Sequence, residues 1–445
     1  MIKVIEQTKG KELMYVMYID DIFDGVTQIN ILYRTTECYV NDSKYYFIYD
    51  GAMNPIRESF EFLNNYYGTK SINTRTMALH ALKILYSYEK IIGTKLEDFT
   101  STDLIGFKEF LLGFCRKGKV IEFANLTERQ PDTVNMYLGI YRAYLKSQGK
   151  KNQYLEESSG KSVSYISNYD YTTHKSAGYK SNVKTVTKTE IPQYISVDEF
   201  SHIISLIRKK YSKREECIIR LMYETGMRIG EVLGLTNEDV RCEQVNGSYY
   251  YAIYIRNRVC DKYYQLAKSV RNPVSATEYK GKKYNTINYG YQMLFVTEEL
   301  FQLICDYIEE AHSKARDNYE KRYKKSYADI VTDDEENFYI FVNNYGSPLS
   351  NITWNSILKN IFNEAGIIVD KHIREHNLSH RFRHGFAMFQ VQYMKRDAVE
   401  LSKLMRHSSI SSTLIYYNPT ISDKIKLKTE FTKELYSILP ELKNI

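Results

Sequence analysis

Three short segments of the chain carry arginine, histidine and tyrosine residues at spacings that could bind and attack an anion. In the first segment, at 223–235, we expect an apolar helix to end at Gly226 and a new helix to begin directly after Arg228. Arg228 would then lie at a helix start, where its guanidinium and the helix dipole both favour an anion. Taken alone, this segment is equally compatible with a surface arginine at a corner between two helices.

The second and third segments add histidines and a pair of tyrosines. The second reads HNLSHRFRHGFA at 376–387, and His380 and Arg383 within it are three residues apart, so they share one face of a helix. The third reads LMRHSSISSTLIYY at 404–417, with a histidine before polar turn residues, a short helix and a tyrosine. Histidine can move a proton near neutral pH, and a tyrosine oxygen can act as a nucleophile once it loses its proton.

Taken in order, the patterns T-G-x-R-I-x-E, H-x-x-R-H-x-F-A and H-S-S-I-x-x-T-x-x-Y resemble the motifs of the tyrosine recombinases. That family includes phage-type integrases, Xer-like resolvases and transposon integrases. The resemblance covers about 195–420. It implies a catalytic set of two arginines, two histidines and a tyrosine, namely Arg228, His380, Arg383, His407 and Tyr416. Tyr417 is the alternative nucleophile, because it directly follows Tyr416.

The chemistry that the resemblance implies needs these residue types. A tyrosine phenolate can attack the scissile phosphate of DNA and form a 3′-phosphotyrosyl intermediate. Two arginine forks can stabilise the phosphorane oxygens, and a histidine can accept the phenolic proton or bond a phosphoryl oxygen. Because the covalent intermediate conserves the energy of the broken bond, we expect no metal, no nucleotide and no other cofactor.

The family takes the general acid for the 5′-hydroxyl leaving group from a lysine on a β-hairpin. Residues 249–259 and 292–296 have the character of strands and would form that hairpin, although a long insertion separates them here. Lys268, in the sequence Ala-Lys-Ser, resembles the family's lysine best. The alternatives are three lysines further along the insertion, Lys280, Lys282 and Lys283.

Two further features of these segments have more than one interpretation. His372, His376, His380 and His384 are spaced by four and would form a metal-binding stripe on a continuous helix. However, no H-E-x-x-H arrangement occurs, and the preceding sequence Asn-Leu-Ser indicates that a helix begins near His380. We therefore expect no metal site and a structural role for His384. Arg406 stands where the family often has glycine, and it would either contact the DNA backbone or face solvent.

The elements that position these segments are predicted from the periodicity of the apolar residues. Residues 1–53 alternate as strands do and predict a small β-rich N-terminal module, which the resemblance implies is of arm or accessory type. Residues 54–150 change to a helical period and predict four helices. These are expected at 56–67, after Asn73, from an N-cap at Ser101 or Thr102, and from about Pro131. Residues 151–194 are polar and predict an extended linker.

The resemblance adds a fold to each part of this multidomain chain. It implies that residues 54–150 form a four-helix, SAM-like core-binding domain. It also implies that residues 195–420 form a mixed α+β catalytic domain, mainly helical with a small antiparallel sheet. Apolar residues at helical intervals predict a tail helix in 421–445. This helix either packs on its own domain or, as the resemblance favours, docks on a neighbouring protomer.

The implied partner is double-stranded DNA, as two duplexes in a synaptic complex with a homotetramer that assembles from free monomers. Accessory DNA-bending or directionality factors could join this complex. Eight basic residues are candidates for phosphate contacts: Lys70, Arg75, Arg116, Lys117, Arg142, Lys146, Lys150 and Lys151. Each of them, taken singly, is more simply explained as a solvated surface charge.

The composition is compatible with a nucleic-acid partner but does not require one. The 445 residues include 61 Lys and Arg against 54 Asp and Glu, a net charge of +7. The first residues lack an apolar run of signal-peptide length, and no stretch is long and apolar enough for a membrane span. The six scattered cysteines have no C-x-x-C spacing and predict reduced thiols. We expect a cytoplasmic bacterial protein that associates with the nucleoid when active.

Together these features predict a site-specific DNA recombinase, the integrase or transposase of a mobile element. The N-terminal module and the long hairpin insertion favour that role over chromosome resolution. The alternatives are an Xer-like recombinase that resolves chromosomes or plasmids, a catalytically inactive DNA-binding relative, and a type IB-like topoisomerase. Most of the 42 tyrosines are expected to reflect composition alone.

Overall fold

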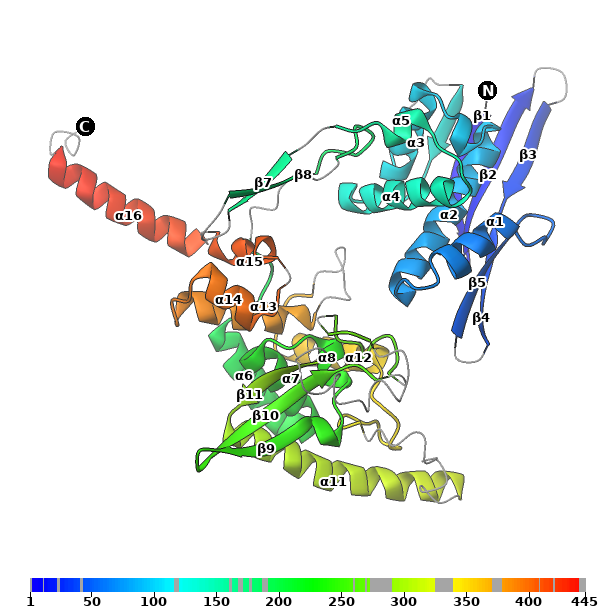
Figure 1. Ribbon diagram of the computed structural model, residues 1–445. Helices are drawn as coiled ribbons and strands as arrows, with labels where there is room; N and C mark the ends of the chain where they lie inside the picture. Colours follow the sequence, from blue (N-terminus) through cyan, green and yellow to red (C-terminus); the bar gives the residue numbers. More distant parts are fainter. Residues whose placement is uncertain are drawn as a thin grey trace. The chain divides into compact units, whose positions relative to one another are not determined.

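The computed structural model divides the chain into two compact units, residues 1–187 and residues 188–445 (Figure 1). The described residues are 2–10, 12–21, 25–40, 43–115, 120–159, 162–166, 171–175, 178–185, 191–258, 261–268, 270–272, 290–324, 339–369, 378–407, 409–418 and 421–439. Within these ranges, no helix is long and apolar enough to span a bilayer.

The first unit begins with strands that form two separate sheets. β1 (Ile2–Lys9), β2 (Glu12–Asp21) and β3 (Gly25–Ile31) are antiparallel neighbours, and the short β6 (Ile121–Ala124) pairs with β1 in parallel. β4 (Arg34–Val40) and β5 (Ser43–Tyr49) form a hairpin of their own. The predicted β-rich character of the N-terminal region is confirmed.

The helices of the first unit begin close to where the sequence predicts them. They are α1 (Arg57–Phe60) with its continuation η1 (Glu61–Tyr66), α2 (Ile72–Ile92), α3 (Ser101–Leu112), α4 (Pro131–Ser147) and the short α5 (Gln153–Glu156). The N-cap predicted for α3 is wrong, because Thr100 caps this helix instead of Ser101 or Thr102. Thr100 and Asp103 exchange the two hydrogen bonds of a capping box.

Strands and helices of the first unit share one hydrophobic core. Val4 and Tyr15 of the four-stranded sheet are fully buried in the same cluster as Tyr46 of β5 and Phe62 and Leu82 of the helices. The N-terminal strands therefore bury their apolar face against the helices. The domain boundaries expected at 53 and 150 stay predictions.

Part of the segment predicted as an extended linker is folded. Asn152 is buried and donates hydrogen bonds to the carbonyls of Leu96 (3.0 Å) and Phe99 (2.8 Å), and Leu155 is fully buried in the core of the first unit. β7 (Ser162–Ile166) and β8 (Tyr171–Lys175) pair as an antiparallel hairpin. The polar composition of this segment concealed both the anchoring amide and the hairpin.

Two of the basic residues considered for DNA phosphate contacts instead make contacts within the first unit. Arg75 is buried and donates to the carbonyl of Lys44 at 2.8 Å. Arg142 lies over the ring of Tyr179, with its guanidinium carbon 3.8 Å from the ring centre. Four of the remaining candidates are exposed, namely Lys70, Lys146, Lys150 and Lys151. Arg116 and Lys117 lie outside the described residues.

The second unit is mainly helical with one small sheet, as predicted for the catalytic part of the chain. β9 (Val240–Val245), β10 (Ser248–Arg256) and β11 (Tyr291–Val296) form an antiparallel sheet in the order β11-β10-β9. The two strands of the predicted hairpin are β10 and β11, and β9 is an addition. The first helices are α6 (Val197–Lys210), α7 (Lys213–Thr225) and α8 (Ile229–Leu233). The later helices are α11 (Glu298–Tyr323), α12 (Asn351–Glu364), α13 (His380–Gln392), α14 (Ala398–Leu404), α15 (Ser411–Leu414) with η6 (Ile415–Tyr417), and α16 (Ile421–Ile438).

Helix α7 is central to the second unit, because it packs against both α11 and α13. Its residues Ile218, Leu221 and Met222 are fully buried in the main core of this unit. The end of α7 leads directly into α8, so the packing of α13 on α7 brings the second sequence motif next to the first.

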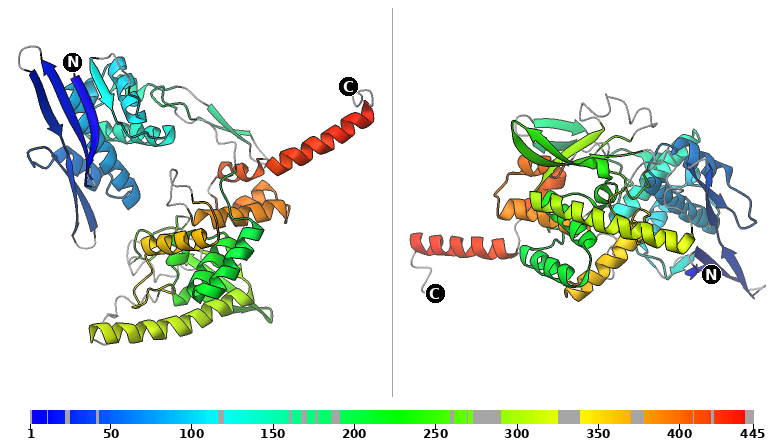
Figure 2. Two further views of the ribbon diagram at one scale, coloured as in Figure 1. Left: turned by 180° about the vertical axis from the view of Figure 1, so that it is seen from behind. Right: turned by 90° about the horizontal axis from the view of Figure 1, so that it is seen from below.

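The predicted tail helix is confirmed as α16, and it extends away from the other helices of its unit (Figure 2). Phe431 is 65% exposed and Ile438 is 69% exposed. Packing of the tail on its own domain was one of the two expectations. These exposed apolar side chains do not pack on their own unit.

Candidate active site

Arg228 is held at the corner between α7 and α8 by backbone geometry. α7 ends at Gly226, whose φ of 65° is left-handed, and Arg228 caps the first turn of α8. A Cβ on Gly226 would lie 2.7 Å from the ring of Phe386, so the close approach of α13 to this corner requires glycine. The predicted place of Arg228 at a helix start is confirmed.

Arg383 connects the segments that carry the three motifs. α13 begins at His380, as predicted, and Arg383 follows one turn later and is only 3% exposed. Its guanidinium donates hydrogen bonds to the carbonyl of Gly226 at the α7–α8 corner and to the carbonyl of Met405 just after α14. A single side chain therefore fixes the distances between segments that are far apart in the sequence.

A buried carboxylate, Glu231, holds the arginines of the site together. One of its oxygens accepts from Arg228 at 2.8 Å and the other accepts from Arg406 at 2.8 Å. Burial favours a raised pKa for Glu231, but Arg406, Arg383 and Arg228 outweigh burial and lower the pKa below its ordinary value. Three guanidinium groups around one carboxylate leave an excess of positive charge for an incoming phosphate.

The expectation that Arg406 faces solvent is wrong, whereas its contact with the DNA backbone stays a prediction. Its side chain is 7% exposed, and a left-handed backbone (φ 53°) directs the guanidinium back to Glu231. Few residues other than glycine adopt this φ, and the buried ion pair offsets part of its cost. The role of Glu231 was not predicted, although its spacing of three residues from Arg228 was an available signal.

Tyr416, the predicted nucleophile, faces the arginines of the site. It is 4% exposed, and its hydroxyl oxygen lies 2.7 Å from Nδ1 of His384. Burial raises the pKa of Tyr416 to about 12, while the nearby charges of Arg383 and Arg228 act in the opposite direction. The arginines therefore favour the phenolate form that a nucleophile must reach.

Tyr417, the alternative nucleophile, points into different surroundings. Its hydroxyl donates to the carbonyl of Arg396 at 2.8 Å. Burial raises its pKa to about 12, and the carboxylates of Asp397 and Glu400 add to that rise. The charges around Tyr417 oppose a phenolate, whereas those around Tyr416 favour one.

The two histidines of the predicted set are neutral at physiological pH. Burial lowers the pKa of His380 to about 4, with Arg383 and Arg228 as the next causes. Burial also lowers the pKa of His407 to about 4, and the same two arginines contribute. Arg228 and Arg383 thus act on both histidines as well as on the tyrosine, so five of the six predicted residues form one cluster.

The sixth residue, Lys268, lies on the loop that follows β10; one pair of contacts joins this loop to the end of β10, and its backbone also comes close to α8. The fully buried Asn257 donates from its side-chain amide to the carbonyl of Ala267 at 2.9 Å and accepts from the N–H of Ala267 at 2.6 Å. The loop backbone also approaches α8 closely, since a Cβ on Gly234 would lie 2.4 Å from the carbonyl of Gln265.

Among the four lysines considered as the general acid, Lys268 belongs to the described residues. Its side chain is exposed, and its charge contributes to the lowered pKa of His380. Lys280, Lys282 and Lys283 lie outside the described residues. The role of Asn257 was not predicted, although the polar sequence Arg-Asn-Arg at the end of an apolar strand was an available signal.

The histidine stripe cannot be followed along its whole length, because His372 and His376 lie outside the described residues. α13 begins at His380, and the rings of His380 and His384 meet edge to face with centres 5.9 Å apart. In the part of the chain that the structure describes, no group of three or more His, Cys, Asp or Glu side chains could hold a metal ion.

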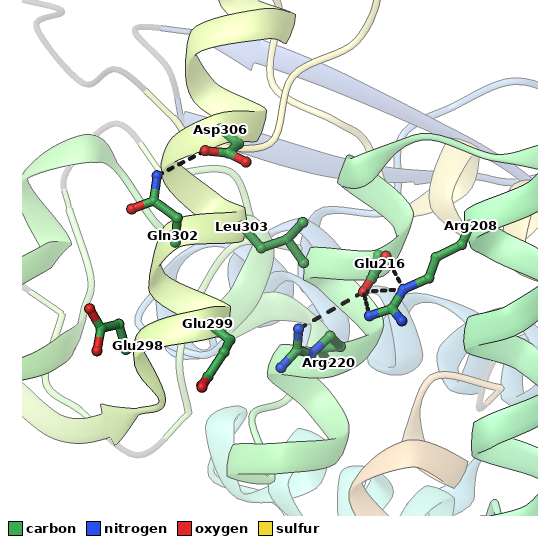
Figure 3. Close-up of a pocket in the computed structure, with 8 residues that line it drawn as sticks. All are labelled: Arg208, Glu216, Arg220, Glu298, Glu299, Gln302, Leu303 and Asp306. Carbon is green, nitrogen blue, oxygen red and sulfur yellow. Dashed lines mark hydrogen bonds and ion pairs between the residues drawn. The ribbon is translucent and has the colours of Figure 1, made fainter.

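A separate cleft of about 520 Å³ lies among α6, α7 and α11 (Figure 3). Its charged lining is largely paired, since Glu216 accepts from Arg208 at 2.7 Å and also lies 3.9 Å from Arg220. None of the six predicted residues lines this cleft. The cleft is therefore a surface of ion pairs that is separate from the arginine cluster.

Comparisons with known proteins identify relatives of this chain. Residues 193–422 match the phage integrase family. Transposase A from transposon Tn554 of Staphylococcus aureus is 24% identical over 389 residues, which cover 86% of this chain and 91% of the transposase. Tyrosine recombinase XerD of Listeria innocua is 25% identical over 240 residues, which cover 54% of this chain and 61% of XerD.

Two solved structures are similar over 84% of this chain. The XerH site-specific recombinase bound to its difH substrate is 18% identical, with 85% of its chain covered and a TM-score of 0.48. The Tn1549 transposon integrase in complex with transposon right-end DNA is 14% identical, with 99% of its chain covered and a TM-score of 0.47. The family match at 193–422 spans more than half of the 445 residues and includes the whole arginine cluster. The chain belongs to the phage integrase family and is a site-specific tyrosine recombinase.

Proposed function

We propose that this recombinase integrates or excises a mobile DNA element by cleaving and rejoining strands through a 3′-phosphotyrosyl intermediate. Tyr416 is the nucleophile. Arg228 and Arg383 bind the non-bridging oxygens of the scissile phosphate. His380 and His407 donate hydrogen bonds to the same phosphate, and Lys268 protonates the 5′ oxygen that leaves.

One arrangement of contacts carries this assignment. Arg383 donates to the carbonyl of Gly226, two residues before Arg228, and to the carbonyl of Met405, two residues before His407. The neighbouring His384 lies 2.7 Å from the hydroxyl of Tyr416. A phosphate held by the two guanidinium groups would therefore lie next to the tyrosine and next to both histidines. Positive charge directed at the phosphorane usually makes a large contribution to the stabilisation of the transition state in such a reaction. The same charge favours the phenolate of Tyr416 over that of Tyr417.

The role in a mobile element is supported by the extent of the similarities. The Tn554 transposase aligns with 86% of this chain, whereas XerD aligns with 54%. An Xer-like role in resolving chromosomes or plasmids is the second candidate, since XerD has nearly the same identity over the part it covers.

We further propose that the active form is a homotetramer on two DNA duplexes, with the helices of residues 54–150 acting as a core-binding domain. The exposed Lys70, Lys146 and Lys151 are available for phosphate contacts there. The exposed apolar side chains of α16 are available for a neighbouring protomer.

The test uses nicked suicide duplexes made from the DNA that flanks the gene, incubated with the full chain in EDTA. We expect a covalent protein–DNA adduct that persists in EDTA and disappears in Tyr416→Phe. Tyr417→Phe is the matched control, and it should still form the adduct. An adduct lost in Tyr417→Phe but kept in Tyr416→Phe would reverse the assignment. EDTA-sensitive cleavage without an adduct would refute the mechanism.

The role in a mobile element has its own test. Plasmids that carry both ends of the element should yield an excised circle in cells that express the protein. Plasmids that carry two copies of a chromosomal resolution site should yield none. Recombination of only the second kind would favour the Xer-like role.

A further inference from the structure

His384 is the side chain that contacts the hydroxyl of the proposed nucleophile. Its Nδ1 lies 2.7 Å from the hydroxyl oxygen of Tyr416, and the two rings are 5.7 Å apart between centres. His407, which belongs to the predicted catalytic set, directs its own Nδ1 to the hydroxyl of Thr413 at 2.8 Å. The sequence suggested only a structural role for His384.

The direction of this hydrogen bond depends on which ring nitrogen of His384 carries the proton. Burial lowers the pKa of His384 to about 3, and the surrounding His380, Arg383 and His407 contribute, so the imidazole is neutral. Burial raises the pKa of Tyr416 to about 12, so its hydroxyl keeps its proton. A neutral imidazole has one bare nitrogen, and a phenol is the stronger donor of the two groups. With the ring proton of His384 on Nε2, Nδ1 is the bare nitrogen and the hydroxyl of Tyr416 donates to it.

We propose that His384 is a further catalytic residue, whose Nδ1 holds the hydroxyl of Tyr416 and accepts its proton during the attack on DNA. The proposal rests on the proposed role of Tyr416 as the nucleophile. In the forward step the O–H bond of Tyr416 breaks and the proton moves to Nδ1. The phenolic oxygen forms a bond to phosphorus, the bond from phosphorus to the 5′ oxygen breaks, and that oxygen takes a proton from Lys268. Rejoining reverses each transfer.

The charges around His384 make it a weak base in the free protein and a stronger one when DNA is bound. Arg383 and the two neighbouring histidines disfavour an imidazolium, and burial disfavours it further. A bound phosphate brings negative charge to Arg383 and so compensates the cation that most directly opposes protonation of His384. Proton acceptance is thereby coupled to the presence of the substrate.

Two substitutions separate the hydrogen bond from the proton transfer. Asparagine places its side-chain oxygen near the position of Nδ1, so His384→Asn keeps an acceptor but supplies no useful base. Leucine has a similar size and no acceptor, so His384→Leu removes both functions. A more acidic nucleophile, 3-fluorotyrosine incorporated at position 416, depends less on a base to lose its proton.

The experiment measures the rate of adduct formation on the nicked suicide duplex, with duplex affinity measured alongside. We expect His384→Leu to slow the adduct about 100-fold and His384→Asn about 10-fold, both at wild-type duplex affinity. We expect 3-fluorotyrosine at position 416 to restore a large part of the lost rate in both variants. A merely structural role for His384 predicts no such recovery.

The outcomes distinguish this proposal from the proposed function. A His384→Leu variant that forms the Tyr416-dependent adduct at the wild-type rate overturns the role of His384 and leaves the recombinase mechanism intact. Slow variants that 3-fluorotyrosine does not rescue also overturn it. A wild-type protein that forms no adduct on duplexes from the flanking DNA overturns both.

Discussion

Glu231 balances the charge of the arginine cluster, because its buried carboxylate binds Arg228 and Arg406 at 2.8 Å each. Glu231→Gln leaves these guanidinium groups without their counter-charge and should lower the free energy of unfolding by about 3 kcal/mol at pH 7, measured by chemical denaturation. The pKa of Glu231 is lowered in the folded protein, so this stability is present above the unfolded pKa and is lost as the pH falls through the folded pKa. The difference in the free energy of unfolding between variant and wild type should therefore shrink in acid.

As the matched control, Glu224→Gln breaks the more exposed pair with Arg220 and should cost less than about 1 kcal/mol. Equal losses in the two variants would contradict this explanation.

The loop between β10 and β11 depends on Asn257 for the position of Lys268. The side chain of Asn257 pairs with both the carbonyl and the N–H of Ala267, the residue directly before Lys268. Asn257→Ala should therefore slow DNA cleavage by about 10-fold or more, as a misplaced catalytic group does. A 5′-thiol leaving group needs no general acid, so it should restore the rate in Asn257→Ala and in Lys268→Ala alike. Asn272→Ala is the matched control, because it removes another contact of Asn257 and leaves the Ala267 pair in place. Slow cleavage that the thiol does not rescue would show that Asn257 supports folding alone.

The tail helix α16 is expected to act in the assembly of several chains. Its apolar side chains Phe431 and Ile438 are largely exposed in the single chain, although burial would be favourable for both. The double variant Phe431→Ser, Ile438→Ser should keep the unfolding temperature of the second unit within about 2 °C, because these side chains contribute little to its core. It should also form fewer tetramers on DNA, measured by light scattering after size-exclusion chromatography. Glu434→Ser lies on the same helix and serves as the control. Undiminished tetramers in the double variant would contradict a docking role for α16.

Local patterns in the sequence were sufficient for the motifs and for the elements that carry them. A glycine followed by a new apolar period predicted the α7–α8 corner, and the three-residue spacing of His380 and Arg383 predicted their shared helix. These predictions succeeded because helix starts and i, i+3 neighbours depend on a few adjacent residues. The strand character of β10 and β11 was predicted from their residue types, and the resemblance to the family implied that the two strands pair despite the long insertion between them.

The partners of the site residues were decided by tertiary packing. Arg383 binds a carbonyl 157 positions away, Arg406 binds a carboxylate 175 positions away, and Tyr416 rather than Tyr417 meets His384 across 32 positions. Each contact exists because α7, α13 and the segment after α14 pack against one another. No local period specifies which side chains meet across such distances, since that depends on how the buried faces of separate elements fit together. The residue types of the site could therefore be predicted from the sequence, whereas the hydrogen bonds that relate them came only from the folded chain.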